Sequence, residues 1–154
     1  MPGDVLTPEQ RAYCMSRIRG RDTSPELKVR RYLHSRGFRF RLKRKDLPCR
    51  PDLVMPKFDL VIFVHGCFWH RHEGCGYATT PSTRQEFWSD KFARNAERDQ
   101  RQYRQLREAG WRVLVIWECG LKKIPERIEE IVPLIQESEM FQEWPGTPPR
   151  PTDL

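Results

Sequence analysis

Apolar residues show two kinds of spacing along the chain, and together these predict an α/β domain. Residues 60–64 and 112–117 are short apolar runs rich in β-branched side chains, which is typical of buried strands. Between them, apolar positions recur at spacings of three and four, which predicts a long helix over residues 83–109. A strand, a helix and a strand in this order form a βαβ crossover, so we expect the two strands to be parallel neighbours.

The inner face of this long helix carries polar residues among its apolar ones. The face consists of Phe92, Asn95, Ala96, Asp99, Tyr103 and Leu106. Asp99 is unexpected there, because a buried carboxylate needs an oppositely charged partner or a metal-bound water. From the residues alone, an ion pair with one of the many arginines and a role in holding a metal-bound water are equally open.

Capping signals and alternation predict the remaining elements. Ser24-Pro25-Glu26 is typical of a helix start, and Gly37 is suited to end that helix. Glu26 then lies at the edge of the face turned towards the core. The expected further helices and strands are helices at 7–18, 24–36 and 125–137 and strands at 38–42 and 51–55.

These elements predict a mixed central sheet flanked by helices. We expect the strand at 51–55 to run antiparallel to the strand at 60–64. Residues 1–140 are expected to form a single domain. The tail, residues 141–154, is rich in proline and is expected to be disordered.

Positive charge is concentrated near the N-terminus. Residues 1–50 contain fourteen Lys and Arg against five Asp and Glu, whereas the whole chain of 154 residues has a net charge of +7. A basic segment on a nearly neutral body favours a polyanionic partner, and nucleic acid is the commonest one. A basic surface that is merely solvated is the less favoured alternative.

No stretch of about 18 consecutive apolar residues is present, so we expect no membrane-spanning segment. The N-terminus also lacks the apolar centre of a secretory signal, which makes the cytoplasm the expected location. Thiols stay reduced there, and clustered cysteines bind metal more often than they form disulfides.

Four Cys and His residues have the pattern of a structural zinc site. Cys67, His72 and Cys75 lie in one loop after the strand at 60–64, and Cys119 follows the strand at 112–117. If those strands are parallel neighbours, all four residues leave the sheet at the same edge. Tetrahedral zinc takes four such ligands, so we favour a closed Cys3His site over packed free thiols.

Nearby polar residues predict a catalytic site with magnesium. Asp52 begins an otherwise apolar strand, which suits a turn residue or a Mg2+ ligand, and the main-chain carbonyl of Val64 is a candidate second ligand. His70 is held close to the zinc ligands, where an imidazole beside a metal-bound phosphate acts as an acid or base. His65 is similarly placed and is a further candidate.

Phe68 and Trp69 are adjacent aromatic residues in a polar loop, and Trp88 follows at the start of the long helix. Two neighbouring bulky side chains do not easily enter one core. On a basic protein, exposed aromatic side chains wedge between nucleobases. We therefore expect these three residues to contact DNA.

The motifs together resemble the very-short-patch mismatch repair endonuclease family of bacteria over residues 10–120. The resemblance is carried by Arg21-Asp22-Thr23 with Glu26, by Arg50-Pro51-Asp52, by residues 61–70, by Glu86-Phe87-Trp88, by Glu97-Arg98-Asp99 and by residues 112–119. Val64 and Cys49 depart from the family pattern, and the loop between His72 and Cys75 is one residue longer.

The resemblance implies a fold similar to type II restriction endonucleases. It implies an enzyme that nicks one strand 5′ to the thymine of a T:G mismatch, which arises when 5-methylcytosine deaminates. It also implies roles for the site residues. Asp52 and the Val64 carbonyl bind catalytic Mg2+, and His70 is the catalytic acid or base. Glu26 and Asp99 hold metal-bound waters, and residues 1–22 form a basic helix or arm that grips the DNA.

The expected partner is double-stranded DNA with a T:G mismatch, together with other mismatch-repair proteins, and the expected enzyme is a monomer associated with the bacterial nucleoid. Two alternatives remain open from the sequence. One is a related metal-dependent restriction or mobile-element nuclease with another target. The other is a zinc-stabilised DNA-binding module without catalytic activity.

Overall fold

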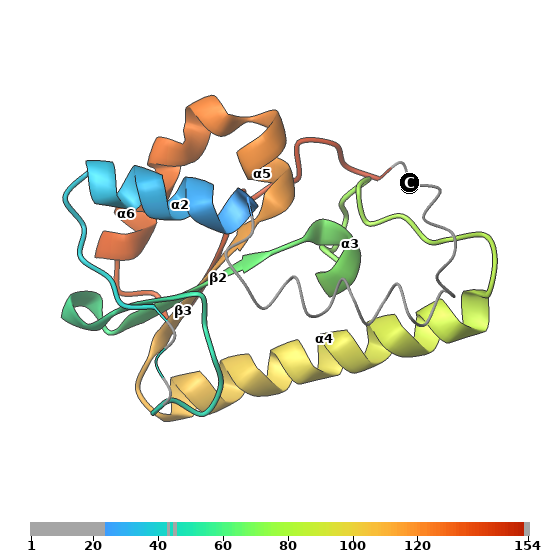
Figure 1. The fold of residues 1–154 in the computed structure, drawn as a ribbon, viewed down its shortest axis with the longest axis horizontal. Helices are drawn as coiled ribbons and strands as arrows, with labels where there is room; N and C mark the ends of the chain where they lie inside the picture. Colours follow the sequence, from blue (N-terminus) through green and yellow to red (C-terminus); the bar gives the residue numbers. More distant parts are fainter. Residues whose placement is uncertain (1–23, 43, 45, 153–154) are drawn as a thin grey trace.

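The protein forms a four-stranded sheet with helices on both faces (Figure 1). The computed structural model describes residues 24–152 apart from residues 43 and 45. The strands are β1 (Leu53–Met55), β2 (Leu60–His65), β3 (Arg112–Trp117) and β4 (Phe141–Trp144), in the order β1-β2-β3-β4. The α-helices are α2 (Ser24–Ser35), α3 (Cys67–His70), α4 (Gln85–Glu108), α5 (Glu118–Lys123) and α6 (Ile131–Gln136).

The pairing of the strands confirms the predicted mixed sheet. β1 is antiparallel to β2, β2 is parallel to β3, and β3 is parallel to β4. α4 connects β2 to β3, as the alternation of apolar patterns predicted. In the register of β2 and β3, His65 pairs with Trp117, so both strands end at the same edge of the sheet.

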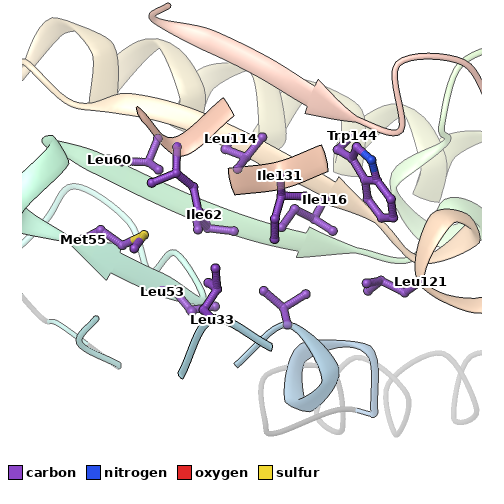
Figure 2. Packing of buried hydrophobic residues seen from close by; sticks show 12 residues of the cluster. Leu33, Leu53, Met55, Leu60, Ile62, Leu114, Ile116, Leu121, Ile131 and Trp144 are labelled. Atoms are coloured by element: carbon purple, nitrogen blue, oxygen red, sulfur yellow. The ribbon is translucent and has the colours of Figure 1, made fainter. Parts of the chain in front are cut away.

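The sheet separates two cores because successive side chains of a strand point to opposite faces. Leu60 and Ile62 of β2 pack on the face covered by α2, α5 and α6, whereas Val61 and Phe63 pack on the face covered by α4. Figure 2 shows the first core, in which Leu33 of α2 approaches the sheet. Burial on both faces explains why β2 and β3 are almost continuously apolar.

The end of α2 follows from its sequence. The N–H of Phe38 donates to the Leu33 carbonyl and the N–H of Gly37 donates to the His34 carbonyl. Gly37 has φ +83°, a left-handed conformation that glycine adopts without a steric cost. The helix thus ends beside the glycine, as predicted.

Two predicted elements are wrong in part. The strand predicted at 38–42 is reduced to one bridge between Arg41 and Val54, although Phe38 and Phe40 do pack on the core. The helix predicted at 125–137 consists of a 3-10 helix, Pro125–Glu130, followed by α6. The helix predicted at 7–18 and the arm at 1–22 lie outside the described residues.

The prediction of a disordered tail is wrong, because Phe141–Trp144 forms β4 beside β3. Trp144 is buried, and it packs so closely on Gly120 that a Cβ atom there would lie 2.6 Å from its ring. The proline content of the following segment, which favours disorder, concealed a strand of only four residues. Within the described part of the chain, no helix is long and apolar enough to cross a membrane.

Arg112 ties together segments that are distant in sequence. Its guanidinium group is buried and donates to the main-chain carbonyls of Phe58, Leu134, Ile135 and Glu139, at 2.9–3.1 Å. These carbonyls belong to the turn after β1, the end of α6 and the segment before β4. Burial lowers the pKa of Arg112, but the four hydrogen bonds compensate the lost hydration.

We expect Arg112→Ala to lower the free energy of unfolding by about 2–4 kcal/mol, because it leaves one buried hydrogen bond and three part-buried ones without their donor. Urea denaturation measures the change. Arg104→Ala, at an exposed position of α4, is the matched control and should stay within about 0.5 kcal/mol of the wild type. Equal stability of the two variants would contradict the proposed role of Arg112.

Candidate active site and metal centre

The carboxyl ends of β2 and β3 carry the candidate functional residues. β2 ends at His65 and leads into α3, and β3 ends at Trp117 and leads into α5, which contains Cys119. Since His65 and Trp117 are paired in register, the segments that follow them start side by side. The edge therefore brings together residues that are about fifty positions apart in the sequence.

Cys67, His72, Cys75 and Cys119 form one buried cluster, as predicted. Their ligand atoms all lie within 4.8 Å of one another. His72 Nδ1 is 3.7 Å from Cys67 Sγ and 3.5 Å from Cys119 Sγ. The His72 ring stacks on Trp117 with the ring centroids 4.2 Å apart, which fixes the direction of this nitrogen.

These distances fit a tetrahedral metal ion. Metal–sulfur bonds of about 2.3 Å and metal–nitrogen bonds of about 2.0 Å place neighbouring ligand atoms about 3.6 Å apart. Three thiols and one imidazole are also a set of ligands that soft or borderline metals prefer. The cluster could therefore hold a metal ion.

The environment of the thiols also favours a bound metal ion. Interaction with the Cys119 thiol, followed by burial, raises the pKa of Cys67, and burial raises the pKa of Cys75. Without a cation, thiolates at this place would be strongly disfavoured. A bound dication reverses this balance, because thiols that coordinate a metal are deprotonated.

Arg71 fastens the loop around this cluster. It has φ +53° directly after α3, and its guanidinium group donates to the carbonyls of Phe68, Ala78 and Thr79. The same group lies 4.0 Å from the centroid of the Phe92 ring. The long loop after β2 is thus anchored to α3 and α4 by one side chain.

The C-terminal segment closes over the other side of the loop. The N–H of Gly76 donates to the Arg150 carbonyl at 2.6 Å, and the N–H of Thr152 donates to the Gly74 carbonyl at 2.9 Å. Cys75 forms an isolated antiparallel bridge with Pro151. A segment that was expected to be disordered therefore contacts a metal-ligand candidate.

A second polar group lies beside the metal cluster. His70 Nδ1 is 2.6 Å from Asp99 Oδ2, and the pair is buried. The rings of His65 and His70 stack with centroids 3.7 Å apart and planes at 3°. Asp99 pairs with a histidine here, and neither alternative that the sequence left open for it included this partner.

Asp52 and Val64 are also brought together. The Val64 N–H donates to Asp52 Oδ2 at 2.7 Å, so the carboxylate lies against the main chain immediately before His65. His65, His70 and Asp99 also offer ligand atoms within 4.8 Å of one another. The catalytic candidates Asp52, just before β1, and those of β2, α3 and α4 thus share one end of the sheet.

Glu26 is buried on α2, on the opposite face of the sheet from α4. Its carboxylate forms an ion pair with Arg30 at 2.8 Å, one helical turn further on. Its predicted role in holding a metal-bound water stays a prediction.

The predicted DNA-contacting aromatic residues form one cluster. Phe68 lies 5.0 Å from Trp69 and 5.7 Å from Trp88, measured between ring centroids, and Trp69 lies 5.7 Å from Trp88. Phe68 and Trp88 are half-buried, whereas Trp69 is 8% exposed. Phe68 and Trp88 are consequently the more accessible members of the group.

Asn95 and Tyr103 were expected on the inner face of α4, but the sequence pattern predicted no role for either. The Asn95 amide donates to the Trp69 carbonyl at 3.2 Å, and the Tyr103 hydroxyl lies 3.0 Å from His65 Nδ1. One sequence signal could have identified them: each lies four residues from Asp99, on the same predicted buried face of the helix.

Comparison with known proteins gives consistent results. The family model described as DNA mismatch endonuclease Vsr matches residues 3–76. The chain is 51% identical over 121 residues to the Type II nicking enzyme V.XorIIP of Xanthomonas oryzae pv. oryzae, covering 79% of this chain and 88% of that protein.

Two further relatives match over most of their lengths. The DNA mismatch endonuclease Vsr of Escherichia coli K12 is 40% identical over 141 residues, which is 92% of this chain and 86% of that protein. The Type II nicking enzyme V.NmeAIP of Neisseria meningitidis serogroup A is 36% identical over 138 residues, which is 88% of this chain and 98% of that protein.

The four-ligand cluster predicts the effect of removing one ligand. Loss of a residue that only hydrogen-bonds to a metal ligand lowers metal affinity by about 10- to 100-fold. Cys119→Ala should lower it further, because this change removes a direct bond to the metal. Metal content after dialysis, measured by mass spectrometry, tests this. Cys49→Ala is the control, since Cys49 is outside the cluster, and it should retain the wild-type content. Equal metal content in both variants would rule out the site.

Proposed function

The chain belongs to the Vsr family of DNA mismatch endonucleases, and on this premise we propose that it nicks one strand of duplex DNA 5′ to the thymine of a T:G mismatch. It is a DNA-cleaving hydrolase, and the family resemblance seen in the sequence is confirmed. The role that we propose is very-short-patch repair of deaminated 5-methylcytosine. The observation that carries the proposal is the buried pair of His70 and Asp99. The ring of His70 also stacks on His65, which lies at the end of β2.

The catalytic cation that we propose is Mg2+, held by Asp52 and the main-chain carbonyl of Val64. Carboxylate and carbonyl oxygens are ligands that Mg2+ prefers, and the 2.7 Å contact of Asp52 with the Val64 N–H supports their common site. When bound, the ion would polarise the phosphate and stabilise the charge of the transition state. Glu26 and Asp99 are proposed to hold metal-bound waters.

His70 is proposed to act as the acid or base of the reaction. Its Nδ1 faces the Asp99 carboxylate, which orients the ring and leaves proton transfer to Nε2. The stacking of His65 against His70 supports a shared role of the two imidazoles. Water then attacks the phosphorus, and the bond from phosphorus to the leaving sugar oxygen breaks.

Phe68, Trp69 and Trp88 are proposed to wedge into the duplex beside the mismatch. A wobble pair is easier to unstack than a Watson–Crick pair, so wedging favours mismatched DNA. The half-buried positions of Phe68 and Trp88 support first contact through these two rings. Insertion of Trp69 would require the cluster to open.

For the Cys3His cluster we propose structural Zn2+, because the donor set and the distances suit a closed tetrahedral site. The fold is proposed to be of the restriction-endonuclease kind, a view supported by its mixed sheet between helices. Residues 1–140 would form one endonuclease domain, with 1–22 gripping the DNA. The enzyme is proposed to work as a monomer in the bacterial cytoplasm, at the nucleoid, with other mismatch-repair proteins.

Of the two alternatives, the non-catalytic DNA-binding module is set aside by membership of an endonuclease family. The second candidate function is a related nuclease with another target, such as a restriction or mobile-element enzyme. The names of several relatives as Type II nicking enzymes support keeping it. The two functions differ in their dependence on the mismatch.

We expect Asp52→Ala to retain the fold and DNA affinity but to lower nicking in Mg2+ by more than about 100-fold, since a catalytic cation contributes several kcal/mol. Nicking of labelled duplex is measured alongside DNA binding by fluorescence anisotropy. Asp90→Ala, at an exposed position of α4, is the matched control with wild-type activity. Cleavage by Asp52→Ala at the control rate would refute the role of Asp52.

A duplex with one T:G pair should be nicked at least about tenfold faster than the matched C:G and T:A duplexes, which corresponds to about 1.4 kcal/mol of preference. The flanking bases are randomised in all three substrates, so that the target context is measured in the same experiment. Equal rates on the three substrates would favour the nuclease with another target over mismatch repair.

A further inference from the structure

α4 presents three buried polar side chains at intervals of four residues. Asn95, Asp99 and Tyr103 are each 5% exposed, and they lie between the apolar residues Phe92 and Leu106 on the same face. Residues four apart lie one above another on a helix. Burying three polar groups in a row is costly unless each has a partner, so the row indicates a specific function. We call these three residues the polar ladder.

Each member of the polar ladder bonds to a different part of the candidate active site. Asn95 Nδ2 donates to the Trp69 carbonyl at 3.2 Å. Asp99 Oδ2 is 2.6 Å from His70 Nδ1, and the Tyr103 hydroxyl is 3.0 Å from His65 Nδ1. One rigid helix therefore sets the relative positions of the end of β2 and of α3.

The 3.0 Å contact between the Tyr103 hydroxyl and His65 Nδ1 suits donation by the hydroxyl. A phenol has one hydrogen to donate, and no other hydrogen bond of this hydroxyl is found among the described residues, 24–152 without 43 and 45. Burial and the nearby negative charge of Asp99 raise the pKa of Tyr103, so the hydroxyl keeps its hydrogen. Donation to Nδ1 means that a neutral His65 carries its own hydrogen on Nε2.

The neighbouring ring has the opposite arrangement. The Asp99 carboxylate only accepts hydrogen bonds, so His70 donates from Nδ1, and a neutral His70 has its lone pair on Nε2. Both rings turn Nδ1 towards α4, which directs both Nε2 atoms away from their partners on that helix. Because the rings are parallel and 3.7 Å apart, a donor and an acceptor lie next to each other.

We propose that Tyr103 is a positioning residue of the nicking reaction, which fixes His65 as the Nε2–H tautomer so that this ring donates a hydrogen bond to a phosphate oxygen. The adjacent His70 Nε2 accepts the proton of the attacking water as the new oxygen–phosphorus bond forms. The leaving sugar oxygen departs with the electron pair of the broken bond and takes a proton from solvent. The assignment rests on the proposed function, because it names the roles of the two imidazoles in that reaction.

The aromatic packing of Tyr103 allows a test that removes the hydroxyl alone. Its ring contacts Phe63 and Phe141 at centroid distances of 5.4 and 5.3 Å, and phenylalanine preserves both contacts. Tyr32→Phe is the matched control. The hydroxyl of Tyr32 is also buried, has no hydrogen-bond partner among the described residues, and belongs to α2 on the other face of the sheet.

We expect Tyr103→Phe to lower the single-turnover nicking rate at saturating T:G duplex by about 10- to 100-fold, with the DNA dissociation constant and melting temperature close to wild type. Tyr32→Phe should nick at the wild-type rate. A loss of affinity without loss of rate, or equal rates of wild type and Tyr103→Phe, would overturn the proposal.

Long-range 15N–1H NMR spectra of the DNA-free protein report the His65 tautomer without any substrate. The wild type should show Nε2–H at His65, and Tyr103→Phe should show a mixture of tautomers. A wild-type His65 protonated at Nδ1 would refute the assignment, even if the variant failed to fold. If the wild type does not nick T:G duplex, the proposed function fails, and the NMR result still decides the tautomer.

Discussion

The parallel pairing of β2 with β3 is the constraint on which the rest of this structure depends. Its register sets His65 beside Trp117, so the loop after one strand and the helix after the other begin at the same place. Cys119 can then complete a cluster whose other three members follow β2. A shift by one residue would move each buried side chain from one core to the other, so the different packing of the two cores holds this register.

α4 has two roles that follow from its geometry. Its apolar residues cover one face of the sheet, where Leu106 and Tyr103 pack against the side chains of β2 and β3. The polar ladder on the same face reaches past the end of the sheet to His65, His70 and the main chain of Trp69. A long, straight element can serve both purposes because the rise of a helix carries its inner face from the core to the site.

The loop after β2 has little apolar core of its own, and its stability comes from fixed points at its edges. The Cys3His cluster closes it from within, Arg71 fastens it to α3 and α4, and the segment around Arg150 borders it on the outside. α3 carries both Phe68 and His70, so whatever orders this loop also orders the aromatic cluster and the catalytic candidate. Metal binding and DNA cleavage are therefore expected to be coupled through one short helix.

Local sequence determined much of the arrangement. Capping signals located α2, helical spacing located α4, and apolar runs located β2 and β3. The order of strand, helix and strand determined that β2 and β3 are parallel. Residue type and short spacing identified Cys67, His72 and Cys75, and the parallel pairing added Cys119. These features were accessible because they depend on period and on side-chain chemistry.

Only the tertiary structure decided which partner each buried polar group has. Asp99 meets His70 and Tyr103 meets His65 across 29 and 38 residues, and no local pattern encodes such a choice. β4 was hidden for a related reason, because four residues before a proline-rich segment become a strand only when the edge of β3 is available. Contacts between distant segments depend on the packing of the whole domain, whereas periodicity is a property of the chain alone.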